Sequence, residues 1–306
     1  MKKRPIIIDT DPGIDDALAI AIALFDETLD VKLITTVAGN VGIDKVTYNT
    51  LRLLKYFEKE DIPVAVGADR PLIRAYEDAS SVHGKSGMEG FDFEEPTQTP
   101  LKENAVDAMR RVIMESEEPV TLIPIAPLTN IALLLKTYPE VNQHIEELIL
   151  MGGSASRGNK GVMSEFNIAL DPEAAHIVIH SGVKLTMVGL DVGMKALILP
   201  QDSEEIKDMN KTGFMAYSLF KRYRGGSFNT GLKMYDATAI AYLLQPDLFE
   251  AEYTTLDVEL SGSMTAGCTL VDLRGYLGKD KNATVCLDID GDRFREWFKN
   301  SIRKCI

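Results

Sequence analysis

The chain has 306 residues, of which 45% are hydrophobic and 26% charged. This composition is that of an ordinary globular protein and excludes disordered and fibrous classes. The excess of 46 Asp and Glu over 33 Lys and Arg gives a net charge of −13, which repels polyphosphate chains, so we expect no DNA or RNA partner.

The first long apolar run, residues 17–25, is far shorter than the roughly 20 residues that a membrane-spanning helix requires. The apolar stretch after the basic residues 2–4 ends at Asp9 and is too short for a signal peptide. The three cysteines lack CxxC spacing, which is typical of free thiols in a reducing compartment. We therefore expect a cytoplasmic protein without a membrane span.

Short apolar runs alternate with helical patterns along the first two thirds of the chain. The predicted strands are 5–10, 31–37, 64–66, 120–125, 147–151 and 183–190. The predicted helices between them are 15–24, 44–57, 102–115, 128–138 and 172–180. Because buried parallel strands are apolar throughout, this alternation predicts an α/β fold with a mostly parallel, Rossmann-like central sheet flanked by helices.

The remainder of the chain predicts extra C-terminal helices and strands. Helices are expected near 202–209, 213–223 and 234–244, strands at 253–260, 268–273 and 284–289, and a closing amphipathic helix at 293–302. A Gly, Ser and Asn-rich loop is expected at 224–231. Since no linker or repeat interrupts the pattern, we expect a single domain over residues 1–306. Its two long loops, near 68–100 and 153–167, are expected to be functional.

The most informative segment, residues 6–20, reads as a buried strand, a turn and a helix. It carries Asp9, Asp11, Asp15 and Asp16, four carboxylates within eight residues. Crowded carboxylates raise one another's pKa unless a cation or hydrogen-bond donors hold them, so the cluster indicates a metal site. The alternative is that Asp15 merely caps the helix after a Pro12-Gly13 turn.

Ligands of an open parallel sheet gather at the carboxyl ends of its strands. The predicted strand ends deliver the aspartates above, Asn40, the segment 124–130, and a loop with Asn159, Glu165 and Asn167. Oxygen ligands with almost no His, Cys or Lys favour a hard cation, calcium or magnesium. Without a phosphate-binding Lys or glycine-rich loop, a sugar is the expected ligand rather than a phosphate.

The segment 9–17, DTDPGIDDA, resembles the N-terminal signature of the nucleoside hydrolases, the inosine-uridine preferring and related ribonucleoside hydrolases. Further family motifs recur in order: AGN at 38–40, VHG at 82–84, PLTNIA at 127–132, MGG at 151–153, EFN at 165–167, DPEAA at 171–175 and YDA at 235–237. The resemblance implies that water cleaves the N-glycosidic bond of a ribonucleoside, giving free base and ribose. The reaction would pass through an oxocarbenium-like centre, with one calcium ion holding the water and the ribose diol.

The resemblance also implies a role for each matching position. Asp11 would bind calcium and deprotonate the water, and Asp16, Asp236 and the Ile125 carbonyl would complete the metal ligands. Asp15, Asn40 and Asn167 would hold the 2′- and 3′-hydroxyls, Asn159 and Glu165 the 5′-hydroxyl, and Met151 would be a further substrate contact. The family also suggests a homodimer or homotetramer and a role in nucleoside salvage.

One position departs from the family pattern. Many members have a histidine before the late calcium-binding Asp, often assigned to protonating the leaving base, whereas this chain has Tyr235. A phenol can donate a hydrogen bond but is a poorer proton source at pH 7 than imidazole. His83 either serves near the base or is a structural histidine in a loop. Tyr217, Tyr223 and Phe228 either stack on the base or pack between helices.

Three other interpretations of the sequence are possible. His176 and His180 have the i,i+4 spacing of metal ligands, but no acidic partner or third histidine accompanies them at family positions, so we expect ordinary helix residues. A strand ending in Asp9-Thr10-Asp11 also resembles aspartate-nucleophile phosphatases. A metal-dependent nucleoside binder that lost turnover with Tyr235 is the non-enzymatic alternative. The hydrolase is favoured because all the matched metal and sugar residues are present.

Overall fold

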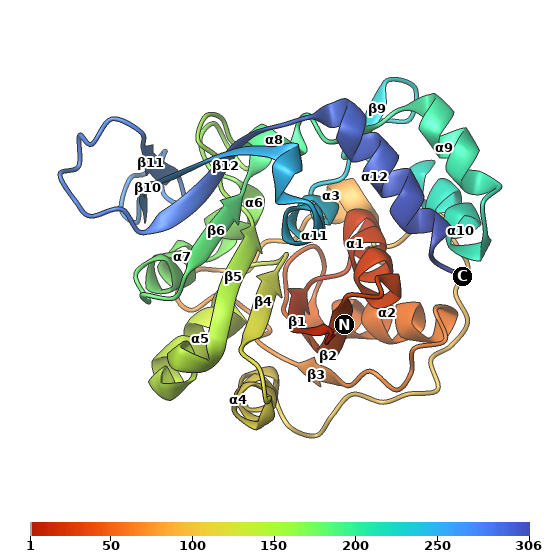
Figure 1. Ribbon diagram of the computed structural model, residues 1–306, viewed down its shortest axis with the longest axis horizontal. Helices are drawn as coiled ribbons and strands as arrows, with labels where there is room; N and C mark the ends of the chain where they lie inside the picture. The colour runs from red at the N-terminus through yellow and green to blue at the C-terminus, as the bar shows by residue number, and fades with distance from the viewer. Residues whose placement is uncertain (1) are drawn as a thin grey trace.

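The computed structural model describes residues 2–306, which contain a nine-stranded sheet with helices on both faces (Figure 1). The strand order is β11-β10-β12-β6-β5-β4-β1-β2-β3. The strands are β1 Arg4–Thr10, β2 Leu29–Thr36, β3 Val64–Val66, β4 Val120–Pro124, β5 Ile145–Met151, β6 Leu185–Val188, β10 Phe249–Val258, β11 Thr269–Asp272 and β12 Ala283–Ile289. From β12 to β3 all neighbours pair in parallel, and β10 is antiparallel to both β12 and β11. The predicted α/β, mostly parallel fold is confirmed.

Side chains of successive β1 residues point to opposite faces of the sheet, which separates two apolar cores. Ile6 and Ile8 lie in one core, and Ile7 lies in the other. The first core lies under α1 Ile14–Phe25, α2 Ile43–Tyr56, α9 Pro200–Lys207, α10 Lys211–Phe220, α11 Ala237–Leu244 and α12 Gly291–Arg303. The second lies under α4 Ala105–Glu115, α5 Thr129–Thr137 and α7 Pro172–Ile179. A strand buried on both faces must be apolar throughout, as these strands are.

Short elements complete the chain. A separate small sheet has the order β7-β9-β8. The short elements are α3 Ser80–His83, η1 Pro139–His144, α6 Phe166–Leu170, α8 Leu190–Gly193, β7 Leu197–Ile198, β8 Gly226–Ser227, β9 Gly231–Lys233 and η2 Pro246–Leu248. The expected loops 68–100 and 153–167 thus contain α3 and the start of α6.

Several predicted boundaries differ from the structure for local reasons. The strand expected over 183–190 ends at Val188, because the chain turns at Gly189 into α8. A Cβ on Gly189 would lie 2.6 Å from the Gly153 carbonyl oxygen, so this close approach needs glycine. The helix expected over 102–115 begins at Ala105, where the Asn104 side chain accepts the Asp107 N–H. The small sheet in the expected 224–231 loop was not predicted.

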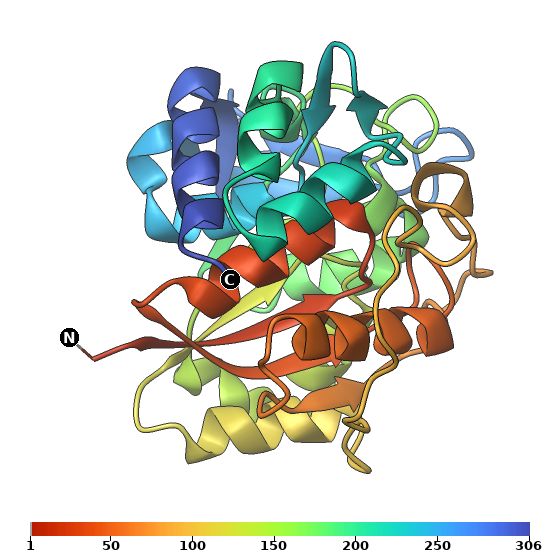
Figure 2. The same cartoon turned by 90° about the vertical axis from the view of Figure 1, so that its right-hand side faces the viewer.

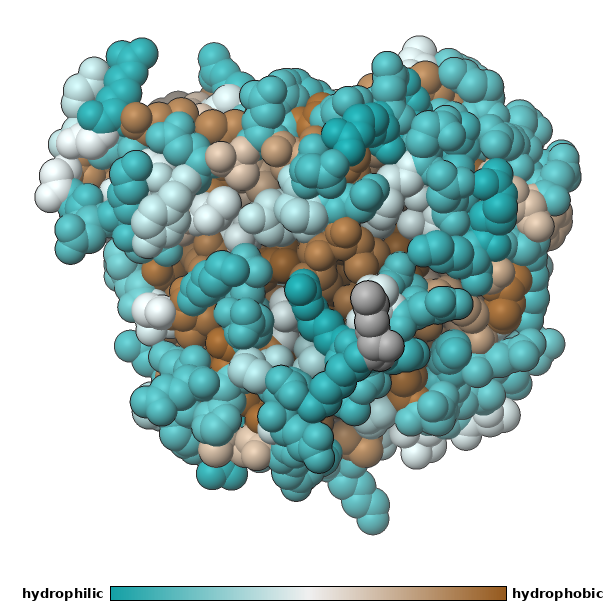
Figure 3. All heavy atoms as spheres, in the orientation of Figure 1, coloured by the Kyte–Doolittle hydropathy of each residue, from teal (hydrophilic) through white to brown (hydrophobic). Residues whose placement is uncertain are grey.

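Hydrophilic side chains cover most of the face shown in Figure 3, with apolar residues visible between them. The chain between β11 and β12 projects from the body at the left of Figure 1. Among residues 2–306, no helix has the length and apolar character needed to cross a bilayer. Cys268, Cys286 and Cys305 are buried free thiols, as the sequence predicts.

The predicted site lies at the carboxyl ends of the parallel strands. In Figure 2, β1 runs from the N-terminus at the left toward the right, where loops lie beyond the strand ends. At this edge the aspartate segment follows β1 and Asn40 lies in the loop after β2. Ile125 follows β4, and Met151 is the last residue of β5. The site therefore follows from the parallel arrangement itself.

Candidate active site

A cavity of 290 Å³ lies at this edge of the sheet. It is lined by residues from distant parts of the chain. The predicted site residues among them are Asp15, Asn40, His83, Ile125, Met151, Asn159, Glu165, Asn167, Tyr235 and Asp236. Asp11 and Asp16 lie directly beneath, through their contacts with Asn40. The structure thus brings the predicted residues together.

Three aspartates form a compact acidic group. Asp15, Asp16 and Asp236 each place one carboxylate oxygen within 4.8 Å of the others. The resemblance assigns two of these residues to the metal and Asp15 to the ribose. Asp16 Oδ2 accepts the Gly13 N–H at 2.9 Å, and Asp16 Oδ1 accepts the Thr10 hydroxyl at 2.7 Å. Asp16 rather than Asp15 therefore makes the backbone contact at the start of α1.

Asp11 is held by the turn that follows β2. The Asn40 N–H donates to Asp11 Oδ2 at 2.6 Å, and the Asn40 side-chain amide donates to the Asp11 carbonyl at 3.1 Å. Asp11 Oδ1 is buried without a hydrogen-bond partner among residues 2–306. One oxygen of this carboxylate is therefore fixed, and the other is available.

Gly39 allows this contact because a side chain there would occupy the Asp11 position. A Cβ on Gly39 would lie 1.9 Å from Asp11 Oδ2. We expect Gly39→Ala to displace the Asp11 carboxylate and lower kcat by more than about tenfold, since small misplacements of catalytic groups are costly. Gly42→Ala is the matched control, because apart from its chain neighbours no residue among 2–306 has an atom within 4 Å of the added Cβ. Steady-state kinetics of both variants test this, and equal activities would contradict it.

The acidic groups are buried in a way that disfavours their charged forms. Burial, and then the neighbouring Asp16, raise the pKa of Asp15 to about 7. Burial and the nearby carboxylates hold the pKa values of Asp11 and Asp236 well above their usual range. Asp15 Oδ1, like Asp11 Oδ1, is buried and lacks a partner in the described chain. A hard cation would bind these unpartnered oxygens and offset the repulsion between the carboxylates, so the donor set fits a divalent ion.

Asn167 joins the ends of β4 and β5. Its side-chain amide donates to the Met151 carbonyl at 3.1 Å and is 3.4 Å from the Ile125 carbonyl. Its own side-chain oxygen is left for another partner. The Ile125 carbonyl, a predicted metal ligand, is thus oriented by a predicted ribose-binding residue.

The loop after β5 is stabilised by its own polar residues. Glu165 accepts the N–H groups of Asn167 and Ile168 at the start of α6, and that of Gly153. Burial nevertheless raises the Glu165 pKa to about 7. The Asn159 side-chain oxygen accepts the Phe166 N–H at 2.9 Å. These two predicted 5′-hydroxyl contacts therefore also shape the loop.

His83 and two tyrosines form the opposite wall of the cavity. His83 Nδ1 accepts the Ile14 N–H at 3.2 Å, so the proton of the neutral ring is on Nε2. Burial lowers the His83 pKa to about 4. Tyr223 is buried with its ring centroid 5.6 Å from that of His83. Burial, and then Asp15 and Glu165, hold the Tyr235 pKa above its usual range, so its hydroxyl keeps its proton.

Some functional neighbours were not predicted, and one open question is resolved. Tyr223 lines the cavity, whereas Tyr217 and Phe228 pack against each other with ring centroids 5.7 Å apart. Arg224 and Lys233 also line the cavity, although almost no Lys was expected there. Arg224 precedes β8 and Lys233 ends β9, in the small sheet that the sequence did not predict.

Many known proteins are similar to this chain in sequence or in fold. Residues 6–296 match the family model described as "Inosine-uridine preferring nucleoside hydrolase". The chain is 52% identical to the non-specific ribonucleoside hydrolase RihC of Klebsiella pneumoniae, over 96% of this chain and 97% of that protein. It is 53% identical to the protein of that name from Salmonella paratyphi B, over 95% of each. The solved purine-preferring ribonucleoside hydrolase from Gardnerella vaginalis aligns with a TM-score of 0.91, 27% identity and 98% coverage of both chains.

Proposed function

Because the chain belongs to the inosine-uridine preferring nucleoside hydrolase family and hydrolyses the N-glycosidic bond of ribonucleosides, we propose that it does so with one calcium ion and Asp11 as the base. The observation that carries this proposal is the buried acidic group with unpartnered oxygens at the cavity floor. Asp11, Asp16, Asp236 and the Ile125 carbonyl would hold the ion. When bound, calcium would supply positive charge that offsets the carboxylates and makes a nearby water more acidic.

Asp11 takes the proton of the attacking water at Oδ1, while the Asn40 N–H holds Oδ2 in place. A buried carboxylate with a raised pKa accepts a proton more readily than an exposed one. The surrounding carboxylates favour the positive charge that develops on the ribosyl group. Asp15, Asn40 and Asn167 hold the ribose diol, Asn159 and Glu165 hold the 5′-hydroxyl, and Met151 contacts the sugar.

The leaving base is assisted by hydrogen bonds rather than by a strong acid. Tyr235 and His83 both line the cavity and are both protonated as neutral donors at pH 7. The Gly193 backbone supports the Tyr235 ring, since a Cβ there would lie 2.3 Å from it. A neutral donor at the base lowers the cost of its departure without transferring a full proton in advance.

Tyr235→Phe is expected to lower kcat on inosine and uridine by less than about tenfold, because one neutral hydrogen bond is lost. The kcat on 4-nitrophenyl riboside should hardly change, since that leaving group needs no proton. Tyr217→Phe, which alters a tyrosine outside the cavity, is the control. An equal loss on both kinds of substrate would show that Tyr235 does not assist departure.

The proposal is tested by measuring ribose release from uridine, cytidine, inosine and adenosine, with calcium and after chelation. We expect chelator-sensitive release from purine and pyrimidine ribonucleosides alike, because the chain resembles enzymes named non-specific. Restoration by magnesium but not calcium would overturn the choice of ion. Ribose release that persists after complete metal removal would show that the reaction needs no metal ion.

Discrimination against 2′-deoxyribonucleosides is expected to be at least about 100-fold in kcat/KM, because a site built to bind a hydroxyl is left unpaired without it. In our proposal Asp15, Asn40 and the ion all bind the ribose diol, and the 2′-deoxy substrate lacks one of its hydroxyls. Competing inosine and 2′-deoxyinosine in one reaction gives the ratio directly. Comparable rates would contradict the assignment of these residues.

The structure argues against the phosphatase alternative. Asp9 Oδ1 accepts hydrogen bonds from Thr35 and Asn130, and Asp9 is not among the residues that line the cavity. A nucleophile must reach its substrate, and Asp9 instead supports the β1 end. The three buried free cysteines are consistent with the reducing, cytoplasmic location that we propose. A homodimer or homotetramer remains our expectation from the family.

A further inference from the structure

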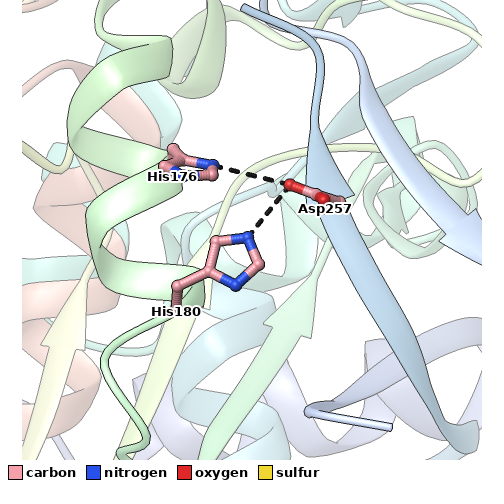
Figure 4. Close-up of side chains that lie close together, drawn as sticks. All are labelled: His176, His180 and Asp257. Atoms are coloured by element: carbon pink, nitrogen blue, oxygen red, sulfur yellow. Dashed lines mark hydrogen bonds and ion pairs between the residues drawn. The ribbon is translucent and has the colours of Figure 1, made fainter. Parts of the chain in front are cut away.

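A second group of potential metal ligands lies outside the active-site cavity. His176 on α7 and His180, the residue that follows its last turn, point toward Asp257 on β10, as Figure 4 shows. Asp257 Oδ1 is 3.5 Å from His176 Nδ1 and 3.1 Å from His180 Nε2. The three donor atoms all lie within 4.8 Å of one another.

The sequence expectation of ordinary helix residues at these positions missed the acidic partner. Asp257 is 77 residues beyond His180 and reaches it only because β10 runs beside α7. This pairing depends on the order of strands at the edge of the sheet. No local pattern contains it.

The spacing of these atoms suits a tetrahedral ion. Ligands about 2.0–2.1 Å from zinc at tetrahedral angles lie about 3.3 Å from each other, close to the two observed nitrogen–oxygen distances. His176 Nδ1 is buried and has no hydrogen-bond partner among residues 2–306. An unpartnered imidazole nitrogen directed at a carboxylate is a ready donor for a metal.

Hydrogen bonds hold the Asp257 carboxylate in place. The residue is buried, and both the Lys279 ammonium and the His180 ring lie within hydrogen-bond distance of its carboxylate. Lys279 occupies Oδ2 at 2.7 Å, which leaves Oδ1 as the oxygen that faces both rings. The Val258 N–H also donates to Oδ1, at 2.8 Å, and fixes its direction.

We propose that His176, His180 and Asp257 form a site for a divalent transition-metal ion, with Zn²⁺ as the preferred occupant. Two imidazole nitrogens and one carboxylate oxygen select zinc-like ions rather than calcium. His176 and His180 remain partly exposed, so water can complete the coordination. The ion connects α7 with β10 and stabilises the folded chain by binding it in preference to the unfolded one.

The experiment is a calorimetric titration of Zn²⁺ into protein whose acidic group is saturated with Ca²⁺. We expect one equivalent of Zn²⁺ to bind, and His176→Gln or His180→Gln to weaken binding by about tenfold or more. Zn²⁺ should raise the melting temperature of the wild type and not of these two variants.

His144→Gln is the matched control. It removes the exposed histidine of η1, which lies outside the cluster, and should leave zinc binding unchanged. The proposal is overturned if no Zn²⁺ binds, if both glutamine variants bind it normally, or if excess Ca²⁺ displaces it. None of these results bears on hydrolysis, since neither His176 nor His180 lines the active-site cavity.

Discussion

Asp11→Asn is expected to lower kcat by about 10³-fold, the range typical of losing a general base. The amide keeps the shape of the side chain, so its oxygen can still accept the Asn40 N–H. It cannot take a proton from water, and it contributes no negative charge to the cation. The affinity for calcium should therefore fall as well.

The same substitution should stabilise the metal-free protein. Asp11 is repelled by Asp16, Asp15 and Asp9, and a neutral amide ends this repulsion. An inactive variant with a higher melting temperature in chelator cannot be dismissed as misfolded. Kinetics, calcium titration and thermal melts of the wild type and variant provide the measurements.

Asp69→Asn is the control for Asp11→Asn, because it removes an exposed carboxylate that forms an ion pair with neighbouring Arg70, outside the cavity. Its kcat and calcium affinity should match the wild type. If Asp11→Asn retained normal turnover, another residue would have to be the base, and our mechanism would be wrong.

The order of strands and helices could be predicted because buried parallel strands have a distinctive composition. The strand expected at 64–66 matches β3 residue for residue. Helix starts were less accurate where a cap decides them: α4 begins after Asn104 and α10 after Asn210, whose side chains accept backbone N–H groups. The strands β7 and β8 have two residues each and are too short to show any periodicity.

The centre of the candidate site was predictable because its residues follow strands directly. The turn after β1 holds Asp11 and Asp16, and a parallel neighbour brings Asn40 to the same edge. Contacts between remote segments were not predictable in this way. The approach of Tyr223 to His83 and that of Asp257 to His180 depend on how whole elements pack.

Calcium is expected to stabilise the protein more at pH 7.5 than at pH 5. In the metal-free protein, burial raises the Asp15 pKa from 3.8 to about 7. Between these values the folded state keeps a proton that the unfolded state has released, so the free energy of unfolding falls as pH rises through this window. Asp11 and Asp236, whose pKa values are also raised, act in the same direction.

The shift of Asp15, taken singly, corresponds to about 4 kcal/mol at pH above 7. Calcium offsets this cost, because a positive charge held by Asp16 and Asp236 lies close to Asp15 and favours the charged form of its carboxylate. The rise in melting temperature on adding calcium should therefore be larger at pH 7.5 than at pH 5 by at least about 5 °C, given roughly 2 °C per kcal/mol for a chain of this size.

His83 acts in the opposite direction, because burial lowers its pKa to about 4 and makes folding less favourable under acid conditions. Comparing melts with calcium and with chelator at each pH removes most of this contribution, since His83 is present in both samples. Asp16→Asn tests whether the buried carboxylates cause this pH dependence. Because the variant has one carboxylate fewer in the acidic group, the pH dependence of the calcium effect should weaken. A calcium effect that is equal at both pH values would show that the buried aspartates are not what the ion stabilises.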